Sequence, residues 1–168
     1  MNRLEATKRL VIRLTDEIVV GNVGNASRDL WAAGHRPQNY YSQGAMGMPS
    51  SIGLGLALAQ PARTVIVLDG DGSLLMNLGS LATIGVLRPP HLIHIVWDNA
   101  QYQLTGGQLS HTGLGVKLAV MARGAGIPRV AETDDLERFD SLVAEALSTA
   151  GGPWFILARV TPVPSQAS

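Results

Sequence analysis

The sequence predicts an α/β fold, a doubly wound and mostly parallel sheet of about six strands with helices on both faces. Two observations carry this prediction. Short apolar runs rich in β-branched residues, such as 64–68 and 92–97, end at polar or glycine residues, which is typical of buried strands. Segments with apolar residues at helical spacing separate such runs, and strands that alternate with helices form parallel sheets covered on both sides.

The expected strands and helices alternate along the whole chain. The helix at 49–60 begins with Pro49, which suits a first helical turn. Between residues 73 and 87 the leucines follow roughly helical spacing, and Pro89 and Pro90 stop that helix. The other expected elements are helices at 5–15, 26–33, 115–123 and 134–148 and strands at 17–21, 39–42, 128–131 and 153–160.

Length and composition bound the function. With 168 residues, 46% of them hydrophobic, and a formal net charge of zero, the chain can bury its own core and has no charge bias toward nucleic acid or an anionic membrane. No apolar run is long enough for a membrane span, and the N-terminus lacks the apolar core of a signal peptide. The absence of cysteine excludes disulfides and thiolate metal sites and fits a cytoplasmic protein. We expect one domain at 1–168, with a flexible tail at 161–168.

Two strand ends carry the polar groups on which a functional prediction depends. Asp71 follows the strand at 64–68 with a glycine on either side, and Asn99 follows the strand at 92–97. Because parallel strands joined by a crossover helix end at the same sheet edge, Asp71 and Asn99 can converge there. The glycines let the backbone turn and approach an anion closely, and the amides that start the next helix face phosphate oxygens. Carboxylate, amide and main-chain oxygens are ligands for magnesium, so these strand ends predict a magnesium-diphosphate site.

These residues resemble the signature of the thiamine-diphosphate (ThDP) enzyme family, which is Gly-Asp-Gly followed after roughly 25 to 30 residues by Asn-Asn. Asp98 stands in place of the first Asn, at the position that is not the usual ligand. The resemblance implies the ThDP-binding fold and thiamine diphosphate and Mg²⁺ as cofactors. It places the metal ligands on Asp71, on the Asn99 side chain and on the main-chain carbonyl of Gln101.

A second match lies upstream, where residues 41–55 resemble the loop and helix that precede the metal strand in this family. The resemblance implies that Met46 wedges beneath the cofactor and bends it into a V, whereas Met48 is interpreted as ordinary core filling. Gly53 and Gly55 each cost about 1 kcal/mol inside a helix unless close packing requires the missing side chain. The residues that the resemblance implies for cofactor binding are Gly44, Ala45, Met46, Gly70, Asp71, Gly72, Ser73, Asn99 and Gln101.

The polar, glycine-rich stretch 101–113 is typical of an active-site loop. Its Gly-Gly-Gln, followed shortly by His-Thr, resembles one branch of the family, the decarboxylases of sulfopyruvate and phosphonopyruvate. His111 in this loop is a candidate catalytic residue that could donate or accept a proton. His94 lies inside an apolar run and is expected to be structural. Arg28 could bind a sulfonate or phosphonate group, although a solvated position on a helix face is the simpler interpretation.

The resemblance also implies that half of the active site is on another chain. In the family a second, pyrimidine domain presents an activating glutamate to the cofactor, and every strong match here belongs to the diphosphate half. None of the glutamates has a matching context; they are Glu5, Glu17, Glu132, Glu137 and Glu145.

The chain is therefore expected to be the beta-type subunit of a ThDP- and Mg²⁺-dependent 2-oxo acid decarboxylase, most like sulfopyruvate decarboxylase. Its expected partner is a separate pyrimidine-domain (alpha) subunit, in a hetero-oligomer with two or more copies of each chain. The expected substrate is a small anionic 2-oxo acid. Phosphonopyruvate decarboxylase, an acetolactate-forming type of enzyme and a non-catalytic protein of the same fold remain alternatives. The intact Asp71 and Asn99 argue against the last, since a decayed site does not need a glycine-bracketed carboxylate.

Overall fold

A six-stranded, all-parallel sheet forms the centre of the computed structural model, which describes residues 1–149 and 151–163. The strand order is β2-β1-β3-β4-β8-β7. The strands are β1 (Ile18–Gly21), β2 (Asn39–Tyr41), β3 (Val65–Gly70), β4 (Leu92–Asp98), β7 (Arg129–Thr133) and β8 (Trp154–Arg159). The predicted fold class is confirmed, and no strand of this sheet runs antiparallel to its neighbours among the described residues.

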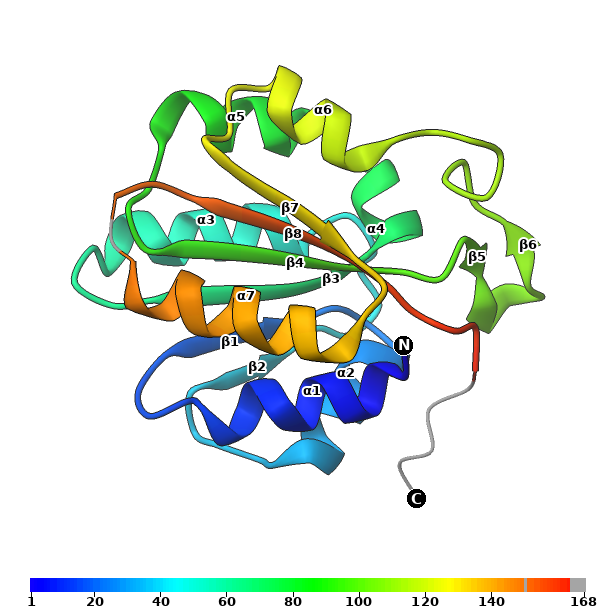
Figure 1. Cartoon of the computed structure of the whole chain (residues 1–168), viewed down its shortest axis with the longest axis horizontal. Coiled ribbons are helices and arrows are strands. Elements are labelled where there is room, and N and C mark those ends of the chain that lie inside the picture. Colours follow the sequence, from blue (N-terminus) through cyan, green and yellow to red (C-terminus); the bar gives the residue numbers. More distant parts are fainter. Residues whose placement is uncertain (150, 164–168) are drawn as a thin grey trace.

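Helices cover both faces of the sheet, and Figure 1 shows α7 in front of it and α3 behind it. The first face packs against α1 (Arg3–Ile12), α2 (Asn25–Ala33) and α7 (Leu136–Ser148). The opposite face packs against α3 (Pro49–Ala59), α4 (Asp71–Leu75), α5 (Gly79–Leu87) and α6 (Leu118–Gly124). No helix of the described residues is both long and apolar enough to cross a membrane.

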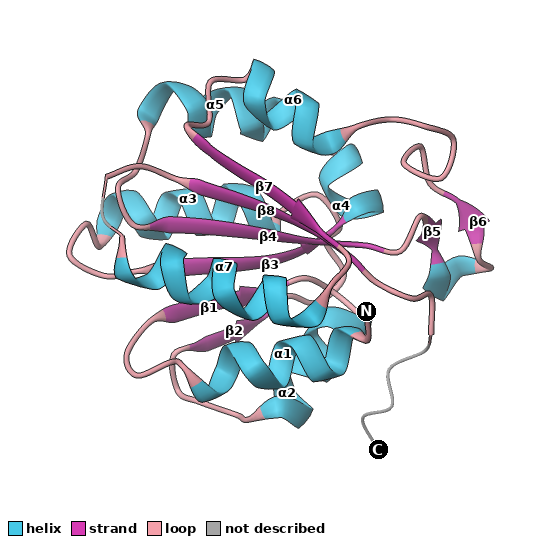
Figure 2. Ribbon diagram, viewed as in Figure 1, coloured by secondary structure: helices cyan, strands magenta, loops and turns pink. Residues whose placement is uncertain are grey.

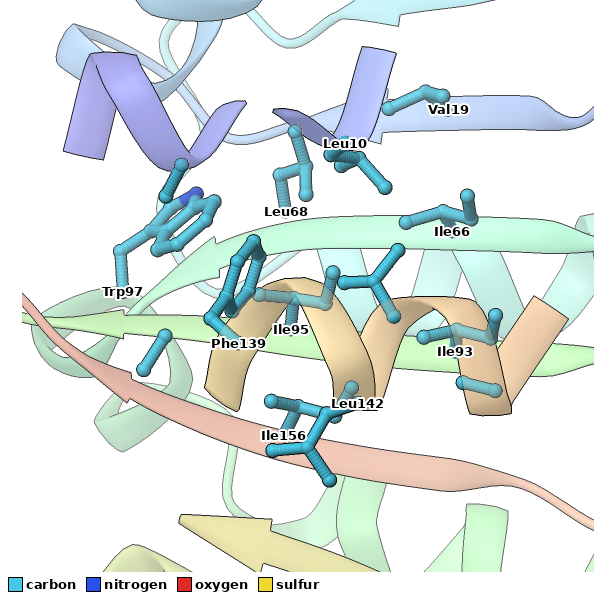
Figure 3. Close-up of a cluster of buried hydrophobic side chains, with 14 of the residues drawn as sticks. Leu10, Val19, Ile66, Leu68, Ile93, Ile95, Trp97, Phe139, Leu142 and Ile156 are labelled. Carbon is cyan, nitrogen blue, oxygen red and sulfur yellow. The ribbon is translucent and has the colours of Figure 1, made fainter. Parts of the chain in front are cut away.

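The two faces have separate apolar cores because successive strand residues point to opposite sides. On β3, Ile66 and Leu68 lie in the α1-α2-α7 core, whereas Val65 and Val67 lie in the other. Figure 3 shows the first core, where Phe139 of α7 lies among strand side chains. Residues 65–68 are therefore buried on both sides of the sheet, as a central parallel strand requires.

Several elements differ from their predicted bounds. The helix expected at 73–87 is two helices, α4 and α5, with a break at 76–78. Asn77 lies in this break, and its Nδ2 donates to Gly47 O at 2.8 Å and to Ser51 Oγ at 3.0 Å. The turn is thus held by contacts outside the helix, which leucine spacing does not reveal.

The loop expected at 101–113 contains more structure than predicted. A short antiparallel pair forms between β5 (Gln101–Tyr102) and β6 (Gln108–Leu109), joined by the 3-10 turn η1 (Gln103–Thr105). In the expected tail, the Thr161 amide donates to Met1 O at 2.9 Å, and residues 164–168 lie outside the described part.

Strand order places a crevice between β1 and β3. From β1 the chain moves to β2 on one side, and then β3 pairs with β1 on the other side. Loops that leave neighbouring strands in opposite directions open a crevice at the carboxyl ends of those strands, where open α/β sheets bind ligands. Gly21, Leu68 and Ile95 share one register row, so β1, β3 and β4 end close together.

Candidate functional site

A cavity of about 110 Å³ occupies this crevice. Its walls come from the segments that follow β1, β3 and β4, together with the loop before α3. The cavity brings together seven of the predicted site residues: Met46, Gly70, Asp71, Gly72, Ser73, Asn99 and Gln101. Gly44, Ala45 and His111 do not line it.

Asp71 is buried at the first turn of α4 and is held by two hydroxyls. Ser110 Oγ donates to Asp71 Oδ2 at 2.5 Å, and Thr112 Oγ1 lies 3.0 Å from the same oxygen. Burial raises the pKa of the Asp71 carboxyl above its ordinary value, and the nearby Asp98 carboxylate raises it further, although the hydrogen bonds from Ser110 and Thr112 oppose the rise. Burial and a neighbouring like charge both destabilise the ionised carboxylate. A bound cation would stabilise it.

Asp98 connects the two predicted ligand segments. Its Oδ1 accepts from the Ala100 amide at 3.1 Å. Thr112 Oγ1 lies between the two carboxylates, 2.8 Å from Asp98 Oδ1 and 3.0 Å from Asp71 Oδ2, and can donate its one proton to either. Ala100 has a φ of 61°, so the backbone turns sharply before Gln101, whose amide donates to Asn99 Oδ1 at 3.1 Å. The residue that departs from the family signature therefore tethers the turn that carries Asn99 and Gln101.

The glycines beside Asp71 are required by close approach rather than by a left-handed backbone. Gly70 has a φ of −114°, and neither Gly70 nor Gly72 is among the described glycines with positive φ. A Cβ on Gly72 would lie 2.5 Å from the Tyr102 ring, and one on Gly70 would lie 3.3 Å from Asn22 Nδ2. Side chains from the β1 and β4 loops thus pack directly on this turn.

The Met46 loop is held to the Asp71 turn by a hydrogen bond from its main chain to a serine side chain. The Gly47 amide donates to Ser73 Oγ at 2.9 Å, and Gly47 has a φ of 81°, which suits glycine. Met46 is half-buried and lines the cavity. Met48 is 45% exposed, so its interpretation as core filling is wrong: α3 starts at Pro49 and directs Met48 outward.

The histidines occupy different environments. His94 is buried on β4, where its Nε2 lies 3.3 Å from Asp69 Oδ2 and its ring meets Phe155 edge-on, as expected for a structural residue. Asp69 in turn accepts from the Gly70 amide at 2.9 Å. His111 is exposed on a turn after Ser110.

The sequence did not indicate several residues of the cavity wall. Asn25 Nδ2 and Asn99 Nδ2 both donate to Gln103 Oε1, at 3.1 and 3.2 Å, and so link the loops after β1 and β4. Arg3, at the start of α1, is 5% exposed and also lines the cavity. Arg28, the cation considered from the sequence, is exposed on α2 and does not line it. An arginine in an N-terminal helix gives no local signal of such a position.

Comparison with known proteins identifies the family of this chain. Residues 21–158 match the family model "Thiamine pyrophosphate enzyme, C-terminal TPP binding domain". The chain is 44% identical over 147 residues to the sulfopyruvate decarboxylase subunit beta of Methanocaldococcus jannaschii, across 87% of this chain and 77% of that relative. It is 40% identical over 161 residues to the phosphonopyruvate decarboxylase of Streptomyces viridochromogenes, across 95% of this chain and 40% of that relative.

Solved structures show the same fold. A thiamine diphosphate-dependent 4-hydroxybenzoylformate decarboxylase of Rhodococcus jostii superimposes with a TM-score of 0.80 at 21% identity, covering 96% of this chain. This chain spans about a third of that structure's length, 33%.

The chain belongs to the thiamine pyrophosphate enzyme family, as a C-terminal TPP binding domain. Within the family it is similar to sulfopyruvate decarboxylase beta subunits and to phosphonopyruvate decarboxylases, so the resemblance drawn from the motifs is confirmed.

The residues present fit the diphosphate end of this cofactor. The first amides of α2, at Asn25 and Ala26, have no partner within the helix and line the same cavity as the α4 turn, so both can face phosphate oxygens. Among the described residues, no three side chains of His, Cys, Asp or Glu gather as a metal cluster. A cation in this cavity therefore needs amide and main-chain oxygens as well as Asp71, which is the predicted donor set.

Proposed function

We propose that this chain is the diphosphate-binding beta subunit of a ThDP- and Mg²⁺-dependent decarboxylase that converts 3-sulfopyruvate into sulfoacetaldehyde and CO₂. The main support is the 44% identity to a sulfopyruvate decarboxylase beta subunit of which this chain covers 77%. The cavity that joins Asp71 and Asn99 gives this similarity a chemical basis. Phosphonopyruvate decarboxylase is the second candidate, because one such relative is 40% identical.

In this proposal the chain anchors the cofactor and sets its shape. Asp71, the Asn99 side chain and the Gln101 carbonyl would hold Mg²⁺, and the first amides of α2 and α4 would bind the diphosphate. Bound thiamine diphosphate would supply a nucleophilic carbon for the keto group and a positively charged ring that accepts the electrons released with CO₂. Met46, which lines the cavity, would fix the cofactor conformation. His111 remains the proposed proton donor or acceptor, and Gly44 and Ala45 remain proposed diphosphate contacts.

The proposal includes a partner, a pyrimidine-domain subunit that supplies the activating glutamate. No glutamate of the described residues lines the cavity, which agrees with a donor on another chain. The η1–β6 segment beside the cavity exposes Leu104 and Leu109 at 57% and 56%, and exposed apolar side chains near a site favour coverage by a partner. We propose a hetero-oligomer with two or more copies of each chain, acting on a small anionic 2-oxo acid.

Decarboxylation by the purified chain tests this split site. We expect no CO₂ release from sulfopyruvate by the chain alone, and release once the pyrimidine-domain subunit is added with ThDP and Mg²⁺. Appreciable release by the chain alone would contradict the split site. Faster turnover of phosphonopyruvate by the complex would favour the second candidate, and formation of acetolactate from pyruvate would indicate a carboligase.

Calorimetry tests the cation site directly. Asp71→Ala should abolish Mg²⁺-dependent ThDP binding by the complex, because it removes the one buried carboxylate proposed as ligand. Asp134→Ala, at an exposed position away from the cavity, is the matched control and should bind normally. Normal ThDP affinity in Asp71→Ala would refute the metal assignment.

A further inference from the structure

Arg3 places a buried positive charge in the wall of the cofactor cavity. The side chain is 6% exposed, and its Nε donates to Asp29 Oδ2 of α2 at 2.7 Å. The N-terminus lies at the edge of the sheet where the strands end, as Figure 2 shows, and the Met1 amine donates to Arg159 O at the end of β8. The start of α1 is thus carried to the same edge as Asp71, and Arg3 lines the cavity there.

A guanidinium in this position has donors to spare. It carries five N–H groups and stays charged in proteins, so the Nε bond to Asp29 leaves donors for a second acceptor. The bond to Asp29 also restrains the guanidinium. Arg3 is the one Lys or Arg among the described residues that line the cavity.

The charge of the proposed ligand calls for such a cation. A diphosphate carries more negative charge than one Mg²⁺ neutralises, and Asp71 offsets part of that metal charge. The first main-chain amides of α2 and the side-chain amide of Asn25 line the same wall. These groups are neutral and stabilise an anion only partly. A buried arginine makes charge-assisted hydrogen bonds to phosphate oxygens, which are stronger than those from neutral donors.

We propose that Arg3, positioned by Asp29, is a cationic donor to a tetrahedral oxyanion bound in this cavity, namely the diphosphate group of the cofactor. The inference rests on the proposed function and adds to it a ligand contact from α1. The same chemistry would accept the sulfonate of the substrate, so the experiment includes a separate probe for that source.

The test removes the ion pair without leaving a buried charge. Arg3→Met combined with Asp29→Leu replaces both partners by apolar groups, which buried ion pairs often tolerate. The matched control is Arg13→Met with Asp140→Leu, since this pair also joins α1 to another helix but does not line the cavity. Calorimetry on the unmodified chain and on each variant measures the affinity for inorganic diphosphate in the presence of Mg²⁺, and circular dichroism checks folding.

We expect the Arg3/Asp29 variant to bind diphosphate at least about tenfold more weakly, and the Arg13/Asp140 control to change by less than about twofold. A folded Arg3/Asp29 variant with unchanged affinity would overturn the role of Arg3 and leave the proposed function standing. Methanesulfonate is the probe for a sulfonate. If the Arg3/Asp29 variant lost methanesulfonate binding but kept diphosphate binding, the phosphate assignment would be overturned. No diphosphate binding by the unmodified chain would instead contradict the proposed cofactor site.

Arg3→Lys provides a second measurement should the double variant not fold. It keeps the charge and the partner Asp29 but loses the forked donor geometry, so we expect weaker diphosphate binding than in the unmodified chain. Unchanged affinity in a folded Arg3→Lys chain would contradict a directed guanidinium contact, because a flexible ammonium does not reproduce a forked donor.

Discussion

The two glycines of α3 should respond differently to alanine. A Cβ on Gly53 would lie 2.1 Å from Val67 Cγ2, whereas one on Gly55 would meet no atom within 4 Å. Val67 is fully buried on β3, and a β-branched side chain has little rotamer freedom to move aside. Gly53 therefore sets the distance between α3 and the strand that carries the Asp71 turn, and Gly55 does not.

The expected magnitudes follow from this contact. Gly55→Ala should raise the free energy of unfolding by about 1 kcal/mol, the helix-propensity difference between the residues. Gly53→Ala gains the same helix propensity, but the clash with Val67 should cost about 1–3 kcal/mol. We therefore expect the substitution to be neutral or to destabilise the chain by up to about 2 kcal/mol.

Urea unfolding followed by circular dichroism measures both variants, and thermal unfolding gives a second reading, at about 2–4 °C per kcal/mol for a domain of this size. Val67→Ala offers a further check, because Gly53→Ala should become stabilising once Cγ2 is gone. Equal stabilisation by both alanines in the unmodified background, or the same cost of Gly53→Ala with and without Val67, would refute the packing argument.

Three further predictions concern the Asp71 turn. The pKa of Asp71 is raised in the folded chain, so protonation favours folding. The cation-free chain should gain stability as pH falls through the raised folded pKa toward the ordinary value of 3.8, and thermal unfolding of Asp71→Asn should lack this gain. Asp98→Asn removes a neighbouring like charge, so the same pH window should move to lower pH in thermal unfolding; an unmoved window would contradict the coupling. Gly72→Ala should destabilise the chain by about 1–3 kcal/mol in urea unfolding, because its Cβ would lie 2.5 Å from the Tyr102 ring, and Tyr102→Ala should relieve that cost.

Much of the fold follows from patterns that the sequence shows locally. The apolar runs at 64–68 and 92–97 predicted buried strands, because a parallel strand covered on both faces is apolar on both. The structure buries residues 65–68 and 92–97. The convergence of Asp71 and Asn99 followed from the same prediction, because parallel strands end at one edge of the sheet. The family signature around these two residues then predicted thiamine diphosphate as the cofactor.

The rest required the tertiary structure. Ser110 and Thr112 bond to Asp71, and Asn77 breaks the predicted helix, through contacts between segments distant in sequence. Periodicity reports which face of an element is apolar, but it does not report which polar side chain reaches a shared cavity.

Arg3 shows this division clearly. The sequence by itself determined the α/β fold, the family and the position of the Asp71 turn, since each depends on short-range pattern. Only the packing of α1 across the sheet placed a buried cation beside that turn, because α1 begins at the edge where β3 and β4 end. That position depends on how helices pack over the whole sheet, a long-range property that no local stretch of residues encodes.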